Sequence, residues 1–485
     1  MLSAAISLLL LGGSARAALQ VDLTSASSIK KAASDVAYDL MGYYSGNLSG
    51  QIPGILPGPP PAGEYYWWEG GALWGTMLDY WHYTGDATYN DVTKQALLFQ
   101  TGPPQNAYMP RNYTISLGND DQGFWGMSAM LAAELNFPNP PEDQPQWLEL
   151  AQAVFNTQAA PDRHDDTCGG GLRWQIPISN IGYDYKNSIA NGIFFNLGAR
   201  LARYTQNNTY AEWAEKTWDW VAGVGMMDDE INVYDGGHVG VNCTDIFKAQ
   251  FSYNAGVFMQ GAAFMYDYTT GEDQKRWGDR VQRLVTRTLE IFFDTGPMIE
   301  VSCELEDRIS CKTDMLAFKG FLHRWMASTA QLAPFAHDSI MNALKNSTAY
   351  AVKACSGGDN GRQCGFRWTT GEYDGLTGAG QEMNVVAALS VLLVDLEKSS
   401  ITGPYTNTTG GTSQGNPFAG TTPDPSYDKG EVTKGDRVGA GILTAIVLTS
   451  LIGALVWMSL GAGESGAAPV KRRGDTRFGK LRRRI

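Results

Sequence analysis

The sequence predicts an all-α protein, an (α/α)6 barrel of six inner and six outer helices followed by one transmembrane helix. Helical stretches of two kinds alternate along the chain, one apolar nearly all round and one amphipathic, and no segment shows convincing strand alternation. Four successive inner stretches begin 66 residues apart, at Asp121, Asn187, Tyr253 and Lys319. Six pairs can close into a ring, whereas an open superhelix, the alternative, has no reason to stop at six.

The chain begins and ends with an apolar run. Residues 1–17 have the apolar run and the Ala15-Arg16-Ala17 triplet of a secretory signal peptide. Residues 438–460 carry no charge and are long enough to span a bilayer, which takes about 20 helical residues. The tail, residues 461–485, is basic, and positive flanks stay cytoplasmic. We therefore expect a single-pass membrane protein of the secretory pathway, with its bulk on the extracellular or luminal side, at the cell surface or in the cell wall. A lipid-anchor signal, the alternative, would end in apolar residues.

The folded domain is expected over residues 18–398, where each amphipathic stretch precedes an apolar one. The amphipathic stretches, expected to form the outer layer, are residues 28–44, 87–100, 146–157, 210–221, 272–292 and 337–353. The apolar stretches, expected to be buried on all sides, are residues 70–83, 122–135, 187–204, 254–268, 320–332 and 381–396. Residues 399–437 are rich in Gly, Thr, Ser and Pro, which predicts a flexible stalk between this domain and the membrane.

The cysteines and the charge limit the chemistry. An even count of six cysteines in an oxidising compartment predicts disulfides, with 15 possible connectivities. The spacing favours two local pairs and leaves a third: Cys303 with Cys311, Cys355 with Cys364, and Cys168 with Cys243. The sequence has no Cys-x-x-Cys motif of a zinc site. His164, Asp165 and Asp166 are potential ligands, but three consecutive residues rarely bind the same ion, so no metal or cofactor is expected. The net charge of −13, with a basic tail, leaves an acidic ectodomain that disfavours nucleic acid and suits neutral or cationic partners.

In the predicted barrel the inner helices run parallel, so the segments that precede them gather at one end. These segments carry aromatic residues, carboxylates and amides, the composition of a sugar-binding cleft. Asp120 and Asp121 are the sharpest feature, because two carboxylates about 5 to 5.5 Å apart can cleave a glycosidic bond with retention. A helix N-terminus favours one ionised Asp, and a like charge raises the pKa of the other. Adjacent acids at a helix start are also ordinary caps, so the pair alone does not establish catalysis.

Five motifs, in order along the chain, resemble glycoside hydrolase family 76. They are residues 118–125, 168–175, 185–192, 250–256 and 318–325. The resemblance covers nearly all of the folded domain and implies an (α/α)6 barrel with retaining endo-α-1,6-mannosidase activity. It implies that Asp120 is the nucleophile and Asp121 the general acid/base. The chain is most similar to the fungal cell-wall branch, in which the C-terminus is often a lipid-anchor signal, so the basic tail departs from that pattern.

The branch implies trimming or transfer of α-1,6-linked mannose chains during cell-wall remodelling, with GPI-linked mannoproteins passed to a β-glucan acceptor. The substrate-binding residues expected beside the catalytic pair are Trp68, Trp125, Asn187, Asp228, Tyr253, Asn254, Lys319 and Arg324, with Asp235 as the alternative to Asp228. Core packing, helix caps, salt bridges and a solvated loop are their ordinary structural roles. The protein is expected to be a monomer.

Two other functions fit the same residues. A wall-glycan binding protein would keep the cleft without turnover, although a lectin has little need of two adjacent unpaired acids. An inverting glycosidase would need carboxylates about 6.5 to 9.5 Å apart, which adjacent residues reach less easily.

Overall fold

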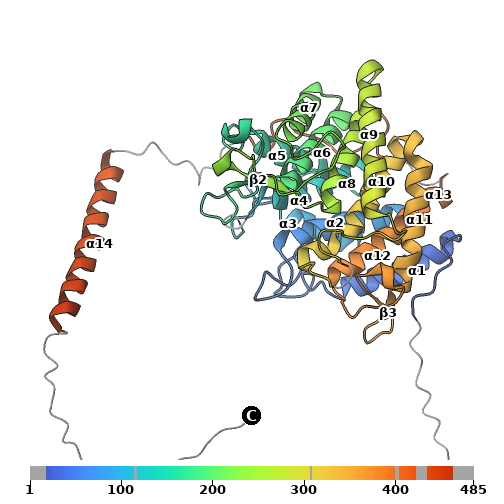
Figure 1. Cartoon of the computed structure of the whole chain (residues 1–485), viewed down its shortest axis with the longest axis horizontal. Coiled ribbons are helices and arrows are strands. Elements are labelled where there is room, and N and C mark those ends of the chain that lie inside the picture. The colour runs from blue at the N-terminus through green and yellow to red at the C-terminus, as the bar shows by residue number, and fades with distance from the viewer. Residues whose placement is uncertain (1–17, 114–116, 306–307, 399–402, 422–433, 462–485) are drawn as a thin grey trace, which may run out of the picture. The chain divides into compact units, whose positions relative to one another are not determined.

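The computed structural model describes residues 18–113, 117–305, 308–398, 403–421 and 434–461 (Figure 1). Two compact units are present, one running to Thr422 and one from Pro423. The predicted signal peptide and the basic tail beyond Gly461 lie outside the described residues, so both stay predictions.

The first unit is a closed ring of helices inside a second ring. The inner helices are α2 (Trp67–Thr84), α4 (Asn119–Glu134), α6 (Ser188–Thr205), α8 (Ser252–Tyr268), α10 (Phe318–Leu332) and α12 (Ala379–Val391), which continues as α13 (Leu393–Leu396). The outer helices are α1 (Ala26–Met41), α3 (Asn90–Phe99), α5 (Trp147–Ala159), α7 (Asn208–Gly223), α9 (Gly271–Phe292) and α11 (His337–Lys353). Each inner helix packs against the next, and α12 returns to α2. The twelve predicted helices and their alternation are confirmed.

Two inner helices begin earlier than the apolar pattern indicates, because polar first turns cap them. The Glu69 carboxylate accepts a hydrogen bond from the backbone N–H of Tyr66 (2.7 Å), and Asp121 accepts one from Gly118 (2.8 Å). Such bonds satisfy N–H groups that have no partner within a helix. The apolar pattern starts only after these turns, so it places the helix starts three residues too late.

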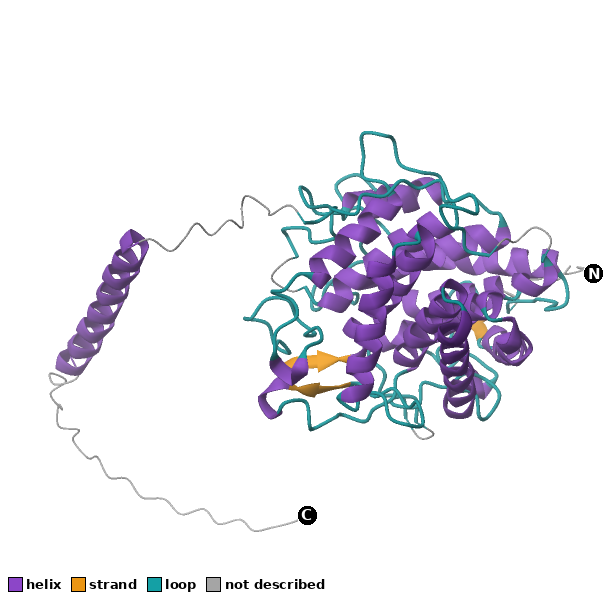
Figure 2. Ribbon diagram, turned by 90° about the horizontal axis from the view of Figure 1, so that it is seen from above, coloured by secondary structure: helices purple, strands orange, loops and turns teal. Residues whose placement is uncertain are grey.

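Two short antiparallel pairs interrupt the loops (Figure 2). The strand β1 (Tyr185–Asn187) pairs with β2 (Gly236–His238), and β3 (Cys355–Gly357) pairs with β4 (Gln363–Cys364). Strands of two or three residues are too short to show alternation, so the sequence did not predict them. The β1–β2 pair joins the loop before α6 to the loop before α8.

Three disulfides fasten the loops, as the cysteine spacing predicted. Their S–S distances are 2.07 Å for Cys168–Cys243, 2.06 Å for Cys303–Cys311 and 2.08 Å for Cys355–Cys364. The first joins the same two loops as the β1–β2 pair.

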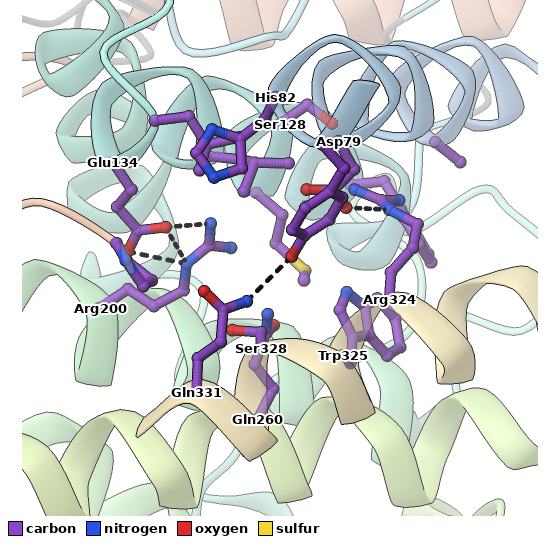
Figure 3. A pocket seen from close by; sticks show the side chains of 17 residues that line it. Asp79, His82, Ser128, Glu134, Arg200, Gln260, Arg324, Trp325, Ser328 and Gln331 are labelled. Carbon is purple, nitrogen blue, oxygen red and sulfur yellow. Dashed lines mark hydrogen bonds and ion pairs between the residues drawn. The ribbon is translucent and has the colours of Figure 1, made fainter. Parts of the chain in front are cut away.

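Buried ion pairs close the end of the barrel opposite the helix starts. Arg200 donates to Glu134 (2.6 Å) and Arg324 to Asp79 (2.5 Å), around a small cavity of about 30 Å³ (Figure 3). Gln331 donates to the hydroxyl of Tyr83 (3.0 Å) in the same cluster. Paired charges satisfy one another away from water, so this end is filled.

The flexible stalk predicted over residues 399–437 is wrong for residues 403–421, which pack on the barrel. The backbone N–H of Tyr405 donates to the carbonyl of Glu134 (2.8 Å), and the buried Ser413 hydroxyl accepts from the N–H of Leu148 (2.9 Å). Asn156 then donates to the carbonyls of Pro417 (3.0 Å) and Ala419 (2.8 Å). Composition indicated a linker, but amide and hydroxyl groups also dock through hydrogen bonds without an apolar pattern. We call residues 403–421 the strap.

The second unit contains the helix α14 (Lys434–Gly461), whose large apolar side chains are exposed. Its segment Arg437–Met458 has a mean hydropathy of 2.2 and is long and apolar enough to cross a membrane. The only other described segment that passes this test, Ala379–Leu396, is 89% buried in the barrel. Length and composition favour a membrane span at α14.

Replacing Ser413 with Ala tests the strap. The change leaves the buried N–H of Leu148 without its acceptor, so we expect the free energy of unfolding to fall by about 1–2 kcal/mol. Gln414→Ala, at the exposed neighbouring position, should change it by less than about 0.5 kcal/mol. Chemical denaturation of residues 18–421 measures both. Equal, negligible effects would mean that the strap is not docked in solution.

Candidate active site

A cleft of about 640 Å³ opens where five inner helices begin. It contains the first residues of α2, α4 and α8, the Asn187 cap of α6 and Phe318 at the start of α10. The prediction that the segments before the inner helices gather at one end is confirmed for these five. Aromatic rings form most of the wall, and four carboxylates face the cleft, namely Asp120, Asp121, Asp235 and Asp314. No Lys or Arg lines it among the described residues.

Asp120 and Asp121 lie in the first turn of α4, held from three sides. The segment after Trp174 runs beside this turn: the carbonyl of Trp174 accepts from the N–H of Asn119 (2.8 Å). Gln158 of α5 donates to the carbonyl of Asn119 (2.7 Å), and Arg163, in the segment after α5, donates to its side-chain oxygen (2.6 Å). This turn is therefore fixed by an outer helix and by loops distant in sequence.

The two carboxylates lie on the same side of Gly118. A side chain at Gly118 would collide with Oδ1 of Asp120 and with Oδ2 of Asp121, so these two oxygens are less than about 5 Å apart. This separation is closer to that of a retaining pair than to that of an inverting pair. Glycine at this position is required by the close approach of the pair.

Burial and mutual repulsion perturb both acids. Burial raises the pKa of Asp120 well above its usual range, and the neighbouring charge of Asp121 raises it further. Burial also raises the pKa of Asp121, to about 6, although the hydrogen bond from the Gly118 N–H lowers it. Oδ1 of Asp120 is buried without a hydrogen-bond partner. Burial and mutual repulsion therefore favour a single proton shared by the pair in the free protein.

Aromatic rings form two walls. Trp68 packs on Phe124 (ring centroids 4.5 Å apart), and Tyr253 stacks on Phe318 (3.8 Å). Both pairs line the cleft. Rings stabilised in this way present flat apolar faces on which a sugar can stack.

Two further acids come from loops. The Asp235 carboxylate accepts a hydrogen bond from the hydroxyl of Tyr185 (2.7 Å), across the β1–β2 pair. Burial raises the pKa of Asp235, while this bond and the adjacent Asn254 amide lower it. Asp314 lies on the 3-10 helix η4 (Thr313–Ala317), and burial raises its pKa as well. Carboxylates in these positions can accept hydrogen bonds from sugar hydroxyls or pair with a cation.

The structure places five of the ten predicted site residues in the cleft. These are Asp120, Asp121, Trp68, Asn187 and Tyr253. Asn254 lies just behind the wall, fully buried beside Asp235.

Three residues expected to bind substrate have structural roles instead. Trp125 is fully buried and stacks on Trp67 (5.1 Å), one layer behind the cleft. Lys319 is buried and paired with Glu304 (2.7 Å). Arg324 closes the opposite end of the barrel through Asp79 (Figure 3). A residue one position further along an inner helix faces another side of the helix, and a residue two turns further along lies deeper in the barrel. Membership of a motif does not reveal either difference.

The structure favours Asp235 over Asp228 as the loop acid. Asp228 does not line the cleft; its carboxylate accepts from Asn232 (2.8 Å) and Tyr234 (2.7 Å), and these bonds lower its pKa although burial opposes them. It caps its own turn. Asp235 is brought inward by β2, a strand that the sequence did not predict.

Several cleft residues were missed. Trp174 and Tyr185 lie in the motifs that carried the resemblance, and Trp67 is next to Trp68 before the first inner helix, so a signal was available for these three. Asp314, on the short 3-10 helix η4, and Phe247, in a loop, have no pattern around them, and nothing in the sequence pointed to them. Among the described residues no group of three or more His, Cys, Asp or Glu is placed to hold a metal ion; the absence of a cofactor stays a prediction.

A closed (α/α)6 barrel with an adjacent pair of buried carboxylates among aromatic rings is the architecture of a glycoside hydrolase. The family model of Glycosyl hydrolase family 76 matches residues 28–404. The chain belongs to this family.

Several similar proteins are fungal. The chain is 44% identical to mannan endo-1,6-alpha-mannosidase DCW1 of Saccharomyces cerevisiae, over 91% of this chain and 95% of that protein. It is 39% identical to mannan endo-1,6-alpha-mannosidase DFG5 of the same yeast, over 91% and 94%. Among solved structures, the chain is similar to Dfg5 from Chaetomium thermophilum, crystallised in complex with glucosamine. The two sequences are 56% identical, and the structures superpose with a TM-score of 0.79 over 83% of this chain and 98% of that one. The GH76A alpha-1,6-mannanase of Salegentibacter sp. HEL1_6, 18% identical with a TM-score of 0.57 over 75% and 98%, shares the fold.

The raised pKa values predict an unusual pH dependence of stability. A carboxyl whose pKa is raised by folding holds its proton more tightly in the folded state. Its protonated form therefore favours the fold at low pH, and this contribution to stability is lost as the pH rises. For Asp121 the loss falls between about pH 4 and pH 6. Asp120→Asn removes one buried acid. We expect it to raise the free energy of unfolding at pH 7 by roughly 1–3 kcal/mol, since one unit of pKa shift is about 1.4 kcal/mol. The gain should shrink at pH 4.

Asp228→Asn is the matched control for this experiment. Because the pKa of Asp228 is lowered by its hydrogen bonds, its stabilising effect is present at pH 7 and is lost as pH falls below about 4. The variant should therefore be less stable than the wild type at pH 7. Denaturation of residues 18–421 at the two pH values measures both. A loss of stability in Asp120→Asn at pH 7 would contradict the proposed strain in the pair.

Proposed function

We propose that the protein is a retaining endo-α-1,6-mannosidase or transglycosylase that acts on α-1,6-linked mannose chains during cell-wall remodelling. The observation that carries this proposal is the pair of buried carboxylates less than about 5 Å apart at the head of α4. The similarity to DCW1 and DFG5 over most of the chain supports the linkage and the sugar.

In the proposed mechanism Asp120 attacks the anomeric carbon while Asp121 protonates the leaving oxygen. The glycosidic bond breaks as a bond between Asp120 and the sugar forms. Asp121, now ionised, then takes a proton from water or from an acceptor sugar hydroxyl, which displaces Asp120. Water gives hydrolysis, and a sugar gives transfer.

In the proposed roles the shared proton lies on Asp121, and Asp120 is ionised. Burial favours protonated Asp120, whereas the Gly118 N–H favours ionised Asp121. The proposed roles therefore need substrate binding to favour the charged form of Asp120. A sugar hydroxyl that donates a hydrogen bond to the Asp120 carboxylate has this effect.

The charge of the cleft supports a neutral or cationic glycan. Four carboxylates without a facing Lys or Arg disfavour phosphate or uronic acids. The similar Chaetomium protein was crystallised with glucosamine, an amino sugar. We propose mannose chains of mannan or of GPI glycans as donors and β-glucan as one acceptor.

We propose that α14 spans a membrane and holds the barrel on the extracellular or luminal side. Its length, its apolar composition and the basic residues that follow it in sequence support this orientation.

The catalytic roles can be separated by chemical rescue. We expect Asp120→Asn and Asp121→Asn each to lower kcat/KM on an α-1,6-manno-oligosaccharide by at least about 100-fold. With an activated aryl mannoside, azide should restore turnover in both, giving the retained azide product with Asp121→Asn and the inverted one with Asp120→Asn. Mass spectrometry and NMR identify the products. If Asp120→Asn gave the retained product and Asp121→Asn the inverted one, the two roles would be exchanged. If the wild type bound the oligosaccharide without any turnover, the protein would be a glycan-binding protein and not an enzyme.

The two loop acids predict different effects on activity. Asp235→Asn removes a charged acceptor in the cleft, so kcat/KM should fall about 10- to 100-fold, the loss expected for a hydrogen bond to a charged group. Asp228→Asn should leave kcat/KM within about 2-fold of the wild type, because Asp228 bonds only within its own loop. A larger loss in Asp228→Asn would restore the original sequence-based choice.

A further inference from the structure

Two isoleucines project from the loop before α6 with nothing covering them. Ile181 is 96% exposed and Ile178 is 82% exposed, the highest values among the large hydrophobic side chains described in the barrel unit. Residues 175–183 contain no charged side chain. Apolar side chains exposed together on a loop tip are typical of a contact surface.

This loop lies at the mouth of the cleft. Gln175 and Tyr185, at its two ends, both line the cleft, and Asn180 donates to the side-chain oxygen of Gln175 (2.9 Å), which holds the loop in shape. Phe247, on the adjoining side of the β1–β2 pair, also lines the mouth and is 57% exposed. We call Ile178, Ile181 and Phe247 the apolar rim.

The strap delivers the chain to this same end of the barrel. Ala419 packs with Ala153 of α5 and with Ala107, in the loop that precedes α4. The carbonyl of Ala107 accepts from Gln122 (2.7 Å), one residue after the catalytic pair. About 15 residues separate Thr421 from Arg437, which span at most about 50 Å when extended. The strap therefore ends beside the loop that precedes α4, and that length of chain separates its end from the apolar segment of α14.

We propose that the apolar rim rests in the interface of the bilayer that anchors the chain, so that the cleft opens beside the lipid headgroups. The proposal rests on the membrane span proposed for α14. A lipid surface fits better than a glycan, because aliphatic tips lack the flat rings on which sugars stack. It fits better than a second copy, because the tether raises the local concentration of lipid around the rim far above that of another barrel. Because the loop is uncharged and the ectodomain acidic, zwitterionic lipid is the expected partner.

Contact with lipid can be measured directly on the full chain. All six cysteines are paired, so a single added thiol can be labelled. Ile181→Cys carries an environment-sensitive bimane in protein reconstituted into phosphatidylcholine vesicles, with and without brominated acyl chains. Phe335→Cys is the matched control, since Phe335 is exposed (46%) on the loop between α10 and α11, at the opposite end of the barrel.

Bromine should quench the label at position 181 and leave that at position 335 unchanged. Equal quenching at both positions, or none at position 181, would overturn the proposal. A shift at position 181 that depends on protein concentration and not on bromine would identify a second copy as the occupant, which also overturns it.

Activity gives an independent readout. Neither isoleucine lines the cleft, so the double variant Ile178→Ser/Ile181→Ser should hydrolyse a soluble α-1,6-manno-oligosaccharide as the wild type does. It should lose most of its turnover on a mannoside attached to lipid in the same vesicles. Equal turnover of the lipid-linked substrate by both proteins would contradict the role of the rim. If the chain does not stay in the vesicles, α14 is not a membrane anchor and this proposal is wrong. Turnover of the soluble substrate tests the catalytic proposal separately.

Discussion

The closure of the inner ring is the constraint on which the rest of the molecule depends. When α12 packs against α2, the starts of the parallel inner helices meet around one axis, and side chains separated by some 250 residues line one cleft. The same closure brings the far ends together, where charges would stand unpaired. Arg200 with Glu134 and Arg324 with Asp79 fill that end. The two ends of the barrel therefore differ: the base holds paired charges, and the cleft end holds acids without a basic partner among the described residues.

The strain of the acid pair is concentrated at one turn. Two carboxylates near each other in a buried site are costly to ionise together, and only firm support keeps them there. Gly118 leaves room for both, Gln158 and Arg163 hold Asn119, and the carbonyl of Trp174 fixes the turn. The adjacent disulfide and the β1–β2 pair bind the loops that supply Asp235. The acid pair therefore lowers the free energy of unfolding, and the hydrogen bonds around its turn offset this loss.

The strap changes the meaning of the C-terminal region. A free stalk would let the barrel face any direction, whereas a docked one sets the point at which the chain leaves the domain. That point lies near the loop before α4, whose Ala107 carbonyl accepts a hydrogen bond from Gln122, the residue after the acid pair.

The sequence by itself predicted the twelve helices, their alternation, the disulfide pairs and the adjacent acids at the head of α4. These depend on local features: apolar periodicity, cysteine spacing and adjacent residues. Only the tertiary structure decided which residues face the cleft. Lys319 follows its helix start as closely as Trp68 and Tyr253 follow theirs, but it points into the core. Trp125 and Arg324 lie further along their helices, in the core and at the base of the barrel. Asp235 reaches the cleft through a three-residue strand pair, and Asp314 through a 3-10 turn. The strap docks through hydrogen bonds between polar groups. Such contacts join distant segments and leave no periodic trace in the chain, so packing alone could reveal them.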